Sequence, residues 1–119
     1  MARKKLPSLR SLRNKADRVF SAWIRRRDAH GRCCTCGSPA SHAGHYIKRQ
    51  HLGTRYDPRN CHAQCVRCNT YLGGNMDEYA KFLIAEYGVD ILLTLGIAKR
   101  SVFKPTREWY AEIIKRYAD

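Results

Sequence analysis

Four of the six cysteines form two pairs with the spacing of metal ligands. Cys33 and Cys36 make one CxxC pair, and Cys65 and Cys68 make a second one after an insert of 28 residues. Each pair can offer two thiolates to one ion from a tight turn, and two pairs complete the tetrahedron of structural zinc. Unrelated buried or redox-active cysteines are the alternative, but they do not explain two equal spacings. A closed site of this kind leaves no position for water or substrate, so it predicts stability rather than catalysis.

The insert between the two cysteine pairs concentrates side chains that suit phosphodiester hydrolysis. Its histidines, and the asparagines on either side of the second cysteine pair, are His42, His45, His51, His62, Asn60 and Asn69. Hydrolysis needs a base to deprotonate water and a cation to balance the charge that builds on the phosphate. A neutral imidazole with a pKa of about 6.5 suits the first role, and a hard divalent ion suits the second. A lone histidine would more often be structural, which is the alternative for each of these.

The composition favours a nucleic-acid partner and a reducing compartment. The chain has 119 residues, enough for one domain with a modest core, and its 23 Lys and Arg against 10 Asp and Glu give a net charge of +13. Such a field attracts polyanions, nucleic acid first and an anionic membrane surface second. No apolar run approaches the ~20 residues of a membrane span, and the N-terminus lacks the apolar segment of a signal peptide. We therefore expect a cytoplasmic protein without a membrane partner, in which Cys34 and Cys61 are small buried residues.

The spacing of apolar residues predicts helices on both sides of the cysteine-rich segment, and an α+β fold. We expect one domain, 1–119, with a basic N-terminal helix within 1–31, a zinc and active-site core at 32–75 and a helical part at 76–119. Residues 1–32 hold eleven Lys and Arg against two Asp, a local charge of +9. This helix is therefore expected to bind phosphate groups, with a solvated surface helix as the alternative.

Capping and turn residues mark the ends of the expected elements. Ser8 and Thr106 are predicted N-caps, and Gly31 and Gly88 are predicted helix ends. A turn-rich connection is expected between two short strands. The predicted strands and a short apolar helix are GHYIK (44–48), CHAQC (61–65) and VDILLTLG (89–96).

Several short motifs occur together in an order that resembles one family. They are CxxCG, AGHY, RYDPRN, QCVRCN, the dipeptide Gly74-Asn75, and Tyr79. From about Ala22 to the C-terminal helix, the chain resembles the NinG/Rap family of lambdoid-phage recombination endonucleases, which are similar to the zinc-containing HNH (ββα-metal) nucleases. The resemblance implies a metal-dependent, structure-specific DNA endonuclease acting on branched recombination intermediates such as Holliday junctions. It also implies a small zinc-clamped ββα-metal core, structural Zn²⁺, and catalytic Mg²⁺ or Mn²⁺.

The same resemblance implies roles for individual residues. His45 corresponds to the general base, Asn60 to the residue that positions it, and Asn69 to the ligand of the catalytic ion that opens the helix. Asn69 departs from the usual histidine, but phage endonucleases that resolve four-way junctions are similar at this position. Many HNH sites have an aspartate ligand before the base, where this chain has Gly44, so His42 is the expected replacement. In a regular strand His42 and His45 face opposite sides, and sharing one site requires a bend that Gly44 permits.

Further residues are assigned to catalysis and to DNA. His62 follows Asn60 by two positions and is expected either to contact the phosphate, as a third catalytic residue, or to be structural. Gln64 and Asn75 are weaker candidates for a supporting role. The residues expected to bind DNA are Arg25, Arg26, Arg27, Lys48, Arg49, Arg55 and Arg59.

Two other functions are compatible with these patterns. A non-catalytic zinc module could bind nucleic acid through the basic helix, but it would not need the combination of His45, Asn60 and Asn69. A sequence-specific HNH nuclease would need a further recognition domain, of which this sequence of 119 residues gives no sign. Cutting opposed strands of a junction requires two active sites, so a homodimer is expected.

Overall fold

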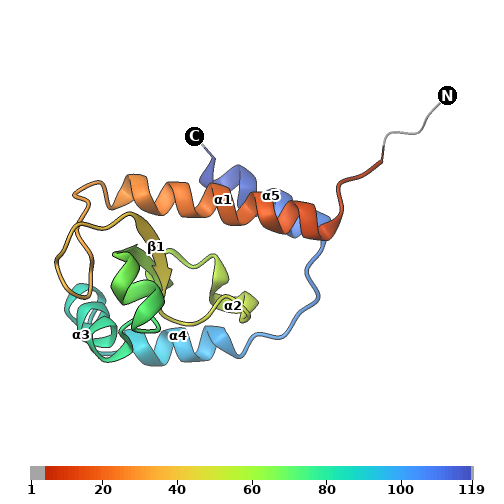
Figure 1. Ribbon diagram of the computed structural model, residues 1–119. Coiled ribbons are helices and arrows are strands. Elements are labelled where there is room, and N and C mark those ends of the chain that lie inside the picture. The colour runs from red at the N-terminus through yellow and green to blue at the C-terminus, as the bar shows by residue number, and fades with distance from the viewer. Residues whose placement is uncertain (1–4, 119) are drawn as a thin grey trace.

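The first helix, α1 (Leu9–Arg27), runs along one side of the molecule (Figure 1). The computed structural model describes residues 5–118; the first four residues of the predicted basic segment lie outside them. The predicted N-cap is confirmed, because Ser8 Oγ accepts a hydrogen bond from the backbone N–H of Ser11 at 3.0 Å. The helix ends at Asp28 rather than at Gly31. The Asp28 carboxylate accepts the backbone N–H of Ala63, which fixes the end of α1 beside the next strand.

The two strands form an antiparallel hairpin that packs against α1. β1 (His42–His45) pairs with β2 (Cys61–Gln64), with His42 opposite Gln64 and His45 opposite Cys61. The second strand lies where it was predicted, but the first begins two residues earlier than expected and ends at His45. The connection contains a short helix, α2 (Leu52–Arg55), and a 3-10 turn, η1 (Pro58–Asn60). The sequence signalled only turns there, since neither segment is long enough to show a helical period.

The remainder of the chain is helical, as predicted. A π-helical turn, η2 (Arg67–Tyr71), contains the second cysteine pair's last residue, and is followed by α3 (Met76–Tyr87), α4 (Ile91–Lys99) and α5 (Arg107–Tyr117). Gly88 ends α3 with a φ of 100°, a conformation that glycine adopts without strain. Thr106 caps α5 by accepting the N–H of Trp109 at 3.1 Å. α4 continues three residues past the predicted segment, through Gly96 to Lys99.

Two small cores lie on opposite sides of the hairpin. On one side α1 packs against α5, with Phe20 and Tyr117 rings 4.9 Å apart at their centroids. On the other side α3 packs against α4 around Tyr79 and Leu83, both fully buried. Figure 1 shows α1 and α5 above the strands and α3 and α4 below them. The α+β prediction is confirmed, and the hairpin between these layers carries the candidate site.

Candidate functional site

The two CxxC pairs converge as predicted. The Sγ atoms of Cys33, Cys36, Cys65 and Cys68 all lie within 4.8 Å of one another, and those of Cys36 and Cys65 are 3.6 Å apart. Zinc–sulfur bonds of about 2.3 Å in a tetrahedron place the sulfur atoms about 3.8 Å apart. All six cysteines are free thiols. The four ligands therefore fit a structural zinc ion, which would fasten the loop before β1 to the turn after β2.

The pKa values of the cysteines are spread widely, and the four clustered cysteines do not share one value. Burial alone would raise the pKa of Cys33, but hydrogen bonds from Thr35 and from backbone N–H groups lower it to about 6. The pKa of Cys65 is raised to about 11: the N–H of Cys68 lowers it, but burial and contacts with the other three sulfur atoms outweigh that effect. Four adjacent thiolates need a cation. By contrast, burial raises the pKa of Cys61 to about 12, so that this residue stays a thiol.

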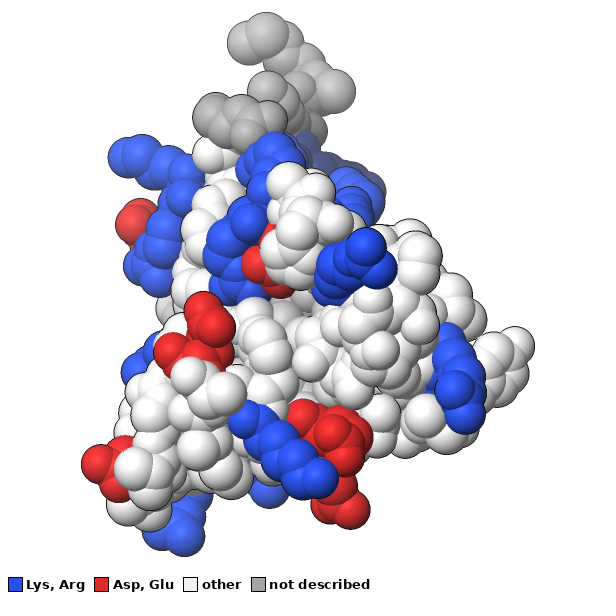
Figure 2. Space-filling model, turned by 90° about the vertical axis from the view of Figure 1, so that its left-hand side faces the viewer, with Lys and Arg blue, Asp and Glu red and all other residues white. Residues whose placement is uncertain are grey.

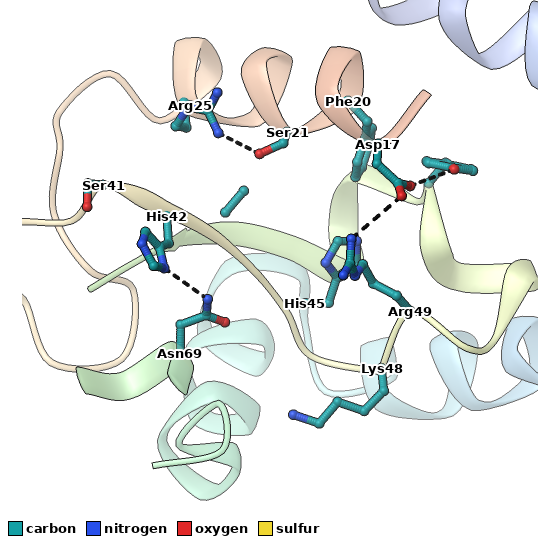
Figure 3. A pocket seen from close by; sticks show the side chains of 12 residues that line it. Asp17, Phe20, Ser21, Arg25, Ser41, His42, His45, Lys48, Arg49 and Asn69 are labelled. Carbon is teal, nitrogen blue, oxygen red and sulfur yellow. Dashed lines mark hydrogen bonds and ion pairs between the residues drawn. The ribbon is translucent and has the colours of Figure 1, made fainter. Parts of the chain in front are cut away.

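A pocket of about 440 Å³ lies between α1 and the zinc-bearing turn η2, along the unpaired edge of β1 (Figure 3). The residues that line it come from α1, from β1 and the loop after it, and from η2. They are Asp17, Phe20, Ser21, Arg25, Ser41, His42, Ala43, His45, Lys48, Arg49, Tyr56 and Asn69. Three predicted site residues, the base and the two cation ligands, are thus brought to one pocket.

His42 and Asn69 meet on the η2 side of this pocket. The Asn69 amide Nδ2 donates to His42 Nδ1 at 3.2 Å, across 27 residues of sequence. Asn69 follows Cys68 in the π-helical turn, and its N–H donates to the Cys65 carbonyl at 2.9 Å, so the zinc cluster fixes its position. An imidazole nitrogen and an amide oxygen fit a hard divalent cation that takes its other ligands from water and phosphate. Both His42 and His45 line this pocket, although they alternate along β1; whether they share one ion stays a prediction.

His45 lies farther along the same pocket, beneath α1. Its Nε2 lies 2.8 Å from the Arg55 carbonyl oxygen. A carbonyl only accepts, so Nε2 carries the proton and Nδ1 keeps its lone pair; Nδ1 is 3.8 Å from the weakly donating Cys61 sulfur. Burial, together with the positive charges of Arg49 and Arg55, lowers the pKa of His45 to about 4. The imidazole is therefore neutral at pH 7, with one nitrogen able to accept a proton.

Asn60 does not touch His45, but it closes the loop that holds His45 in place. This fully buried side chain accepts the N–H of Ile47 at 2.8 Å and donates to the carbonyls of Ile47 at 3.0 Å and Thr54 at 3.1 Å. Thr54 precedes Arg55, whose carbonyl orients the histidine. Asn60 therefore acts on His45 through the backbone on either side of the loop.

Asp17 is a pocket residue that the sequence did not reveal. Its carboxylate accepts two hydrogen bonds from the Arg55 guanidinium, at 3.0 and 2.7 Å, and one from the Tyr56 hydroxyl at 2.7 Å. Although burial raises the pKa of Asp17, these hydrogen bonds hold it below its usual range. Arg55 thus binds Asp17 of α1 through its guanidinium and accepts a hydrogen bond from His45 at its backbone carbonyl. The partners are separated by 38 residues of sequence, and no local pattern connects them.

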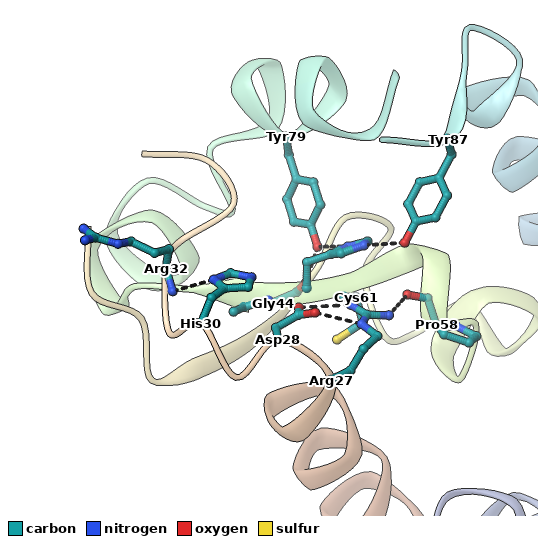
Figure 4. Close-up of polar contacts among 11 residues, drawn as sticks. Arg27, Asp28, His30, Arg32, Gly44, Pro58, Cys61, Tyr79 and Tyr87 are labelled. Atoms are coloured by element: carbon teal, nitrogen blue, oxygen red, sulfur yellow. Dashed lines mark hydrogen bonds and ion pairs between the residues drawn. The ribbon is translucent and has the colours of Figure 1, made fainter. Parts of the chain in front are cut away.

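His62 lies on the opposite face of the hairpin and outside the pocket. Its Nδ1 is 3.2 Å from the Tyr79 hydroxyl and its Nε2 is 2.7 Å from the Tyr87 hydroxyl (Figure 4). Tyr79 donates its own proton to the Gly44 carbonyl at 2.6 Å, so His62 donates from Nδ1 and accepts from Tyr87 at Nε2. Of the two roles predicted for His62, these contacts fit the structural one.

Three of the predicted DNA-binding residues line the pocket. Arg25 donates to Ser21, Lys48 reaches the Gly73 carbonyl, and Arg49 lies 3.6 Å from the Asp17 carboxylate with 58% of its side chain exposed. Figure 2 shows Lys and Arg side chains gathered on the upper part of one face, where α1 and α5 lie. A phosphate in the pocket would meet these cations.

The other four predicted DNA-binding residues have partners within the protein. Arg27 donates to the carbonyls of Pro58 and Cys61, both at 2.7 Å, and so fastens α1 to β2. Arg55 pairs with α1 as described, Arg59 pairs with a neighbouring aspartate, and Arg26 lies 3.4 Å from a carbonyl oxygen of α5. Arg27 and Arg55 therefore hold the fold together, whereas Arg26 and Arg59 are exposed and their contact with DNA stays a prediction.

Comparison with known proteins places these features in a phage family. Residues 1–119 match the sequence model of the family described as the bacteriophage Lambda NinG protein. Protein ninG of Salmonella phage P22 is 38% identical over 78 residues, which cover 62% of this chain. Protein ninG of Escherichia phage lambda is 38% identical over 77 residues, or 61% of this chain. The chain spans 38% of the length of each of these relatives. No solved structure matches it, and within residues 5–118 no helix has the length and apolar character needed to cross a membrane.

Proposed function

Because this chain belongs to the NinG family of bacteriophage proteins, we propose that it is a metal-dependent DNA endonuclease of the HNH (ββα-metal) type. The observation that carries the proposal is one pocket with a cation-binding pair, His42 and Asn69, on one side and a neutral base, His45, on the other. The order of a β-hairpin followed by a helical turn that carries Asn69 supports the same superfamily. Its substrates would be branched recombination intermediates such as Holliday junctions.

In this proposal His45 activates the water molecule. Nδ1 takes the proton of the water that attacks phosphorus, and the Arg55 carbonyl, which already accepts the Nε2 proton, stabilises the imidazolium that forms. A phosphate in the pocket raises the pKa of His45 from about 4 towards neutrality, which strengthens the base when substrate is bound. A divalent cation held by His42 and Asn69, Mg²⁺ or Mn²⁺, would balance the charge on the phosphate and on the departing 3′ oxygen.

The cations around the pocket would hold the DNA backbone. Arg25 stands on α1, while Lys48 and Arg49 stand on the loop after β1, so phosphates could be bound on both sides of the base. Cutting two opposed strands of a junction requires two such sites, and we propose a homodimer for that reason.

The test is cleavage of labelled four-way junction, fork and linear duplex by the zinc-loaded protein, with Mg²⁺, with Mn²⁺ and with EDTA. Branched DNA should be cut in the presence of either metal and should survive in EDTA. A positioned base is typically worth about 10²–10⁴-fold in rate, so His45→Ala should cut at least ~100-fold more slowly while binding junction DNA normally. His51→Ala is the matched control: His51 lies outside the pocket, so this variant should cut at the parent rate.

The variant Asn69→Ala distinguishes the role of the cation from the role of the base. This variant should need a higher Mg²⁺ concentration for the same rate, whereas His45→Ala should gain nothing from added Mg²⁺. If His45→Ala cuts as fast as the parent, the HNH assignment is wrong. If the parent binds junction DNA but cuts none of the three substrates with either metal, the chain is a nucleic-acid-binding zinc module instead.

A further inference from the structure

The side chain of Gln64 has an unusual environment at the end of β2. It is fully buried, and its Oε1 has no hydrogen-bond partner, alone among the buried side-chain nitrogen and oxygen atoms of residues 5–118. Leaving a buried acceptor without a donor costs about 1–3 kcal/mol, so such an atom in a folded protein calls for a physical reason.

The orientation of the Gln64 amide is fixed by its other end. Nε2 donates to the Gly74 carbonyl at 2.9 Å and to Thr35 Oγ1 at 3.2 Å. A carbonyl cannot donate, so exchanging the nitrogen and oxygen of Gln64 would break the bond to Gly74. Thr35 in turn lies 3.1 Å from the Cys33 sulfur, to which its hydroxyl can donate. The zinc-binding loop therefore holds Gln64 with Oε1 pointing away from the zinc cluster.

Gln64 Oε1 and Asn69 Oδ1 face the same small space beside Gly44. A Cβ atom added to Gly44 would overlap Gln64 Oε1 and would lie 3.0 Å from Asn69 Oδ1. Glycine thus makes room for the glutamine where a larger residue on β1 would exclude it. Two acceptor oxygens turned to one space without a donor is an unfavourable arrangement. Meanwhile Asn69 directs its only donor group at His42 Nδ1, 3.2 Å away.

We propose that Gln64 is a positioning residue that holds the Asn69 amide in its cation-binding orientation. A half-turn of this amide about its Cβ–Cγ bond exchanges its two ends. Nδ2 then donates to Gln64 Oε1, which gains the donor it lacks, and Oδ1 turns towards His42 Nδ1. Two lone pairs facing each other at that spacing form a site for a divalent cation. The inference rests on the proposed function, because it concerns the same pair of ligands.

The test measures Mn²⁺ binding to the zinc-loaded protein by calorimetry, without DNA and without turnover. Gln64→Met and Gln64→Glu both remove the donors to Gly74 and Thr35, but only Gln64→Glu keeps an oxygen at the Oε1 position. We expect Gln64→Met to weaken Mn²⁺ binding by about tenfold or more, as is typical when a residue that orients a metal ligand is lost, and Gln64→Glu to retain it. Gln50→Glu, which adds the same charge outside the pocket, controls for general electrostatic attraction.

A second measurement uses the parent protein and does not depend on the folding of any variant. On addition of Mg²⁺, the side-chain amide proton resonances of Asn69, assigned by their absence in Asn69→Ala, should shift as their hydrogen bond moves from His42 Nδ1 to Gln64 Oε1. Equal loss of Mn²⁺ affinity in Gln64→Met and Gln64→Glu, or unmoved Asn69 resonances, would overturn this inference and leave the proposed site intact. If Asn69→Ala binds Mn²⁺ as tightly as the parent, the cation site and this inference both fail.

Discussion

His45 and His62 offer a comparison within one hairpin, since each strand carries one of them; His62 is buried and His45 is half-buried. Burial is the main cause that lowers the pKa of each to about 4. The difference lies in their hydrogen bonds. His62 has a tyrosine hydroxyl at each ring nitrogen. His45 lines the pocket and has the Arg55 carbonyl at Nε2, but at Nδ1 it has only the weakly donating Cys61 sulfur at 3.8 Å. A lowered pKa therefore does not by itself distinguish the proposed base from a structural histidine in this protein; the hydrogen-bond partners of the two ring nitrogens do.

The surroundings of the two histidines differ in the same way. Around His45 lie ionic groups from α1 and the loop, including Asp17 and Arg49, which suit a site where charge develops. Around His62 lie the rings of Tyr79, Phe82 and Tyr87, with the Phe82 ring centroid at 4.8 Å. The nearby charges of Arg27 and Asp28 are paired with each other. The first environment can respond to a phosphate, and the second holds a neutral ring in one orientation.

Removing zinc should unfold the hairpin, so that the environments of His45 and His62 no longer differ. The cluster fixes both ends of the hairpin, and structural zinc contributes on the order of 10 kcal/mol or more of apparent binding energy. Cys65→Ser, or chelation of the parent at neutral pH, should therefore unfold the protein. Elemental analysis should give one zinc per folded chain, and circular dichroism should report the loss of structure. A zinc-free protein with an unchanged spectrum would contradict this prediction.

Replacing His62 should produce the opposite result to replacing His45. His62→Ala removes the partner of the buried Tyr79 hydroxyl and of the more exposed Tyr87 hydroxyl, so we expect a loss of about 1–3 kcal/mol in the free energy of unfolding in urea. Cleavage per folded molecule should stay within about threefold of the parent, because His62 lies outside the pocket. A folded, zinc-loaded His62→Ala protein that cuts ~100-fold more slowly would assign the base to the other face of the hairpin.

The shared pKa of the two histidines predicts how stability depends on pH. Each binds a proton near pH 4 when folded and near pH 6.5 when unfolded, so the unfolded state holds more protons between these values. Stability should be full above pH 6.5 and should fall as the pH drops towards 4, with a slope approaching two protons from the histidines. Urea unfolding at several pH values measures this slope, and His62→Gln should lower it by about one proton. Parent and variant slopes that coincide would contradict the pKa of His62.

The smallest expected effect is a change in how DNA affinity depends on salt when cations on either face of the hairpin are removed. Each phosphate contact contributes about −0.9 to the slope of log affinity against log salt, so replacing Arg25, Lys48 and Arg49 by alanine should flatten that slope by up to about 2–3. The control is Arg32→Ala, an exposed cation beside the His62 pocket, which should leave the slope unchanged. An unchanged slope in the triple variant, or a flatter one in the control, would place DNA on a different face.

Local sequence signals predicted the parts of this structure that depend on neighbouring residues. The paired cysteines and the caps at Ser8 and Thr106 follow from short-range geometry. The resemblance to a family added His42, His45 and Asn69, which the fold brings to one pocket.

Contacts between distant segments could not be predicted in this way. The bond from Arg55 to Asp17 and the two tyrosines around His62 depend on how α1 and α3 pack against the hairpin. The same limit explains why seven arginines and lysines were assigned to DNA when Arg27 and Arg55 hold the fold together.

The packing of α1 against α5 also determines when the pocket can form during synthesis. Phe20 and Tyr56, which line the pocket, rest on Tyr110 and Tyr117 of the last helix. Ribosomes add roughly 5–20 residues per second, so several seconds separate the emergence of α1 from that of α5. Throughout that interval α5 does not yet cover the apolar face of α1, and α1 is not held in place over His45. The pocket is therefore expected to form only once α5 has docked on α1.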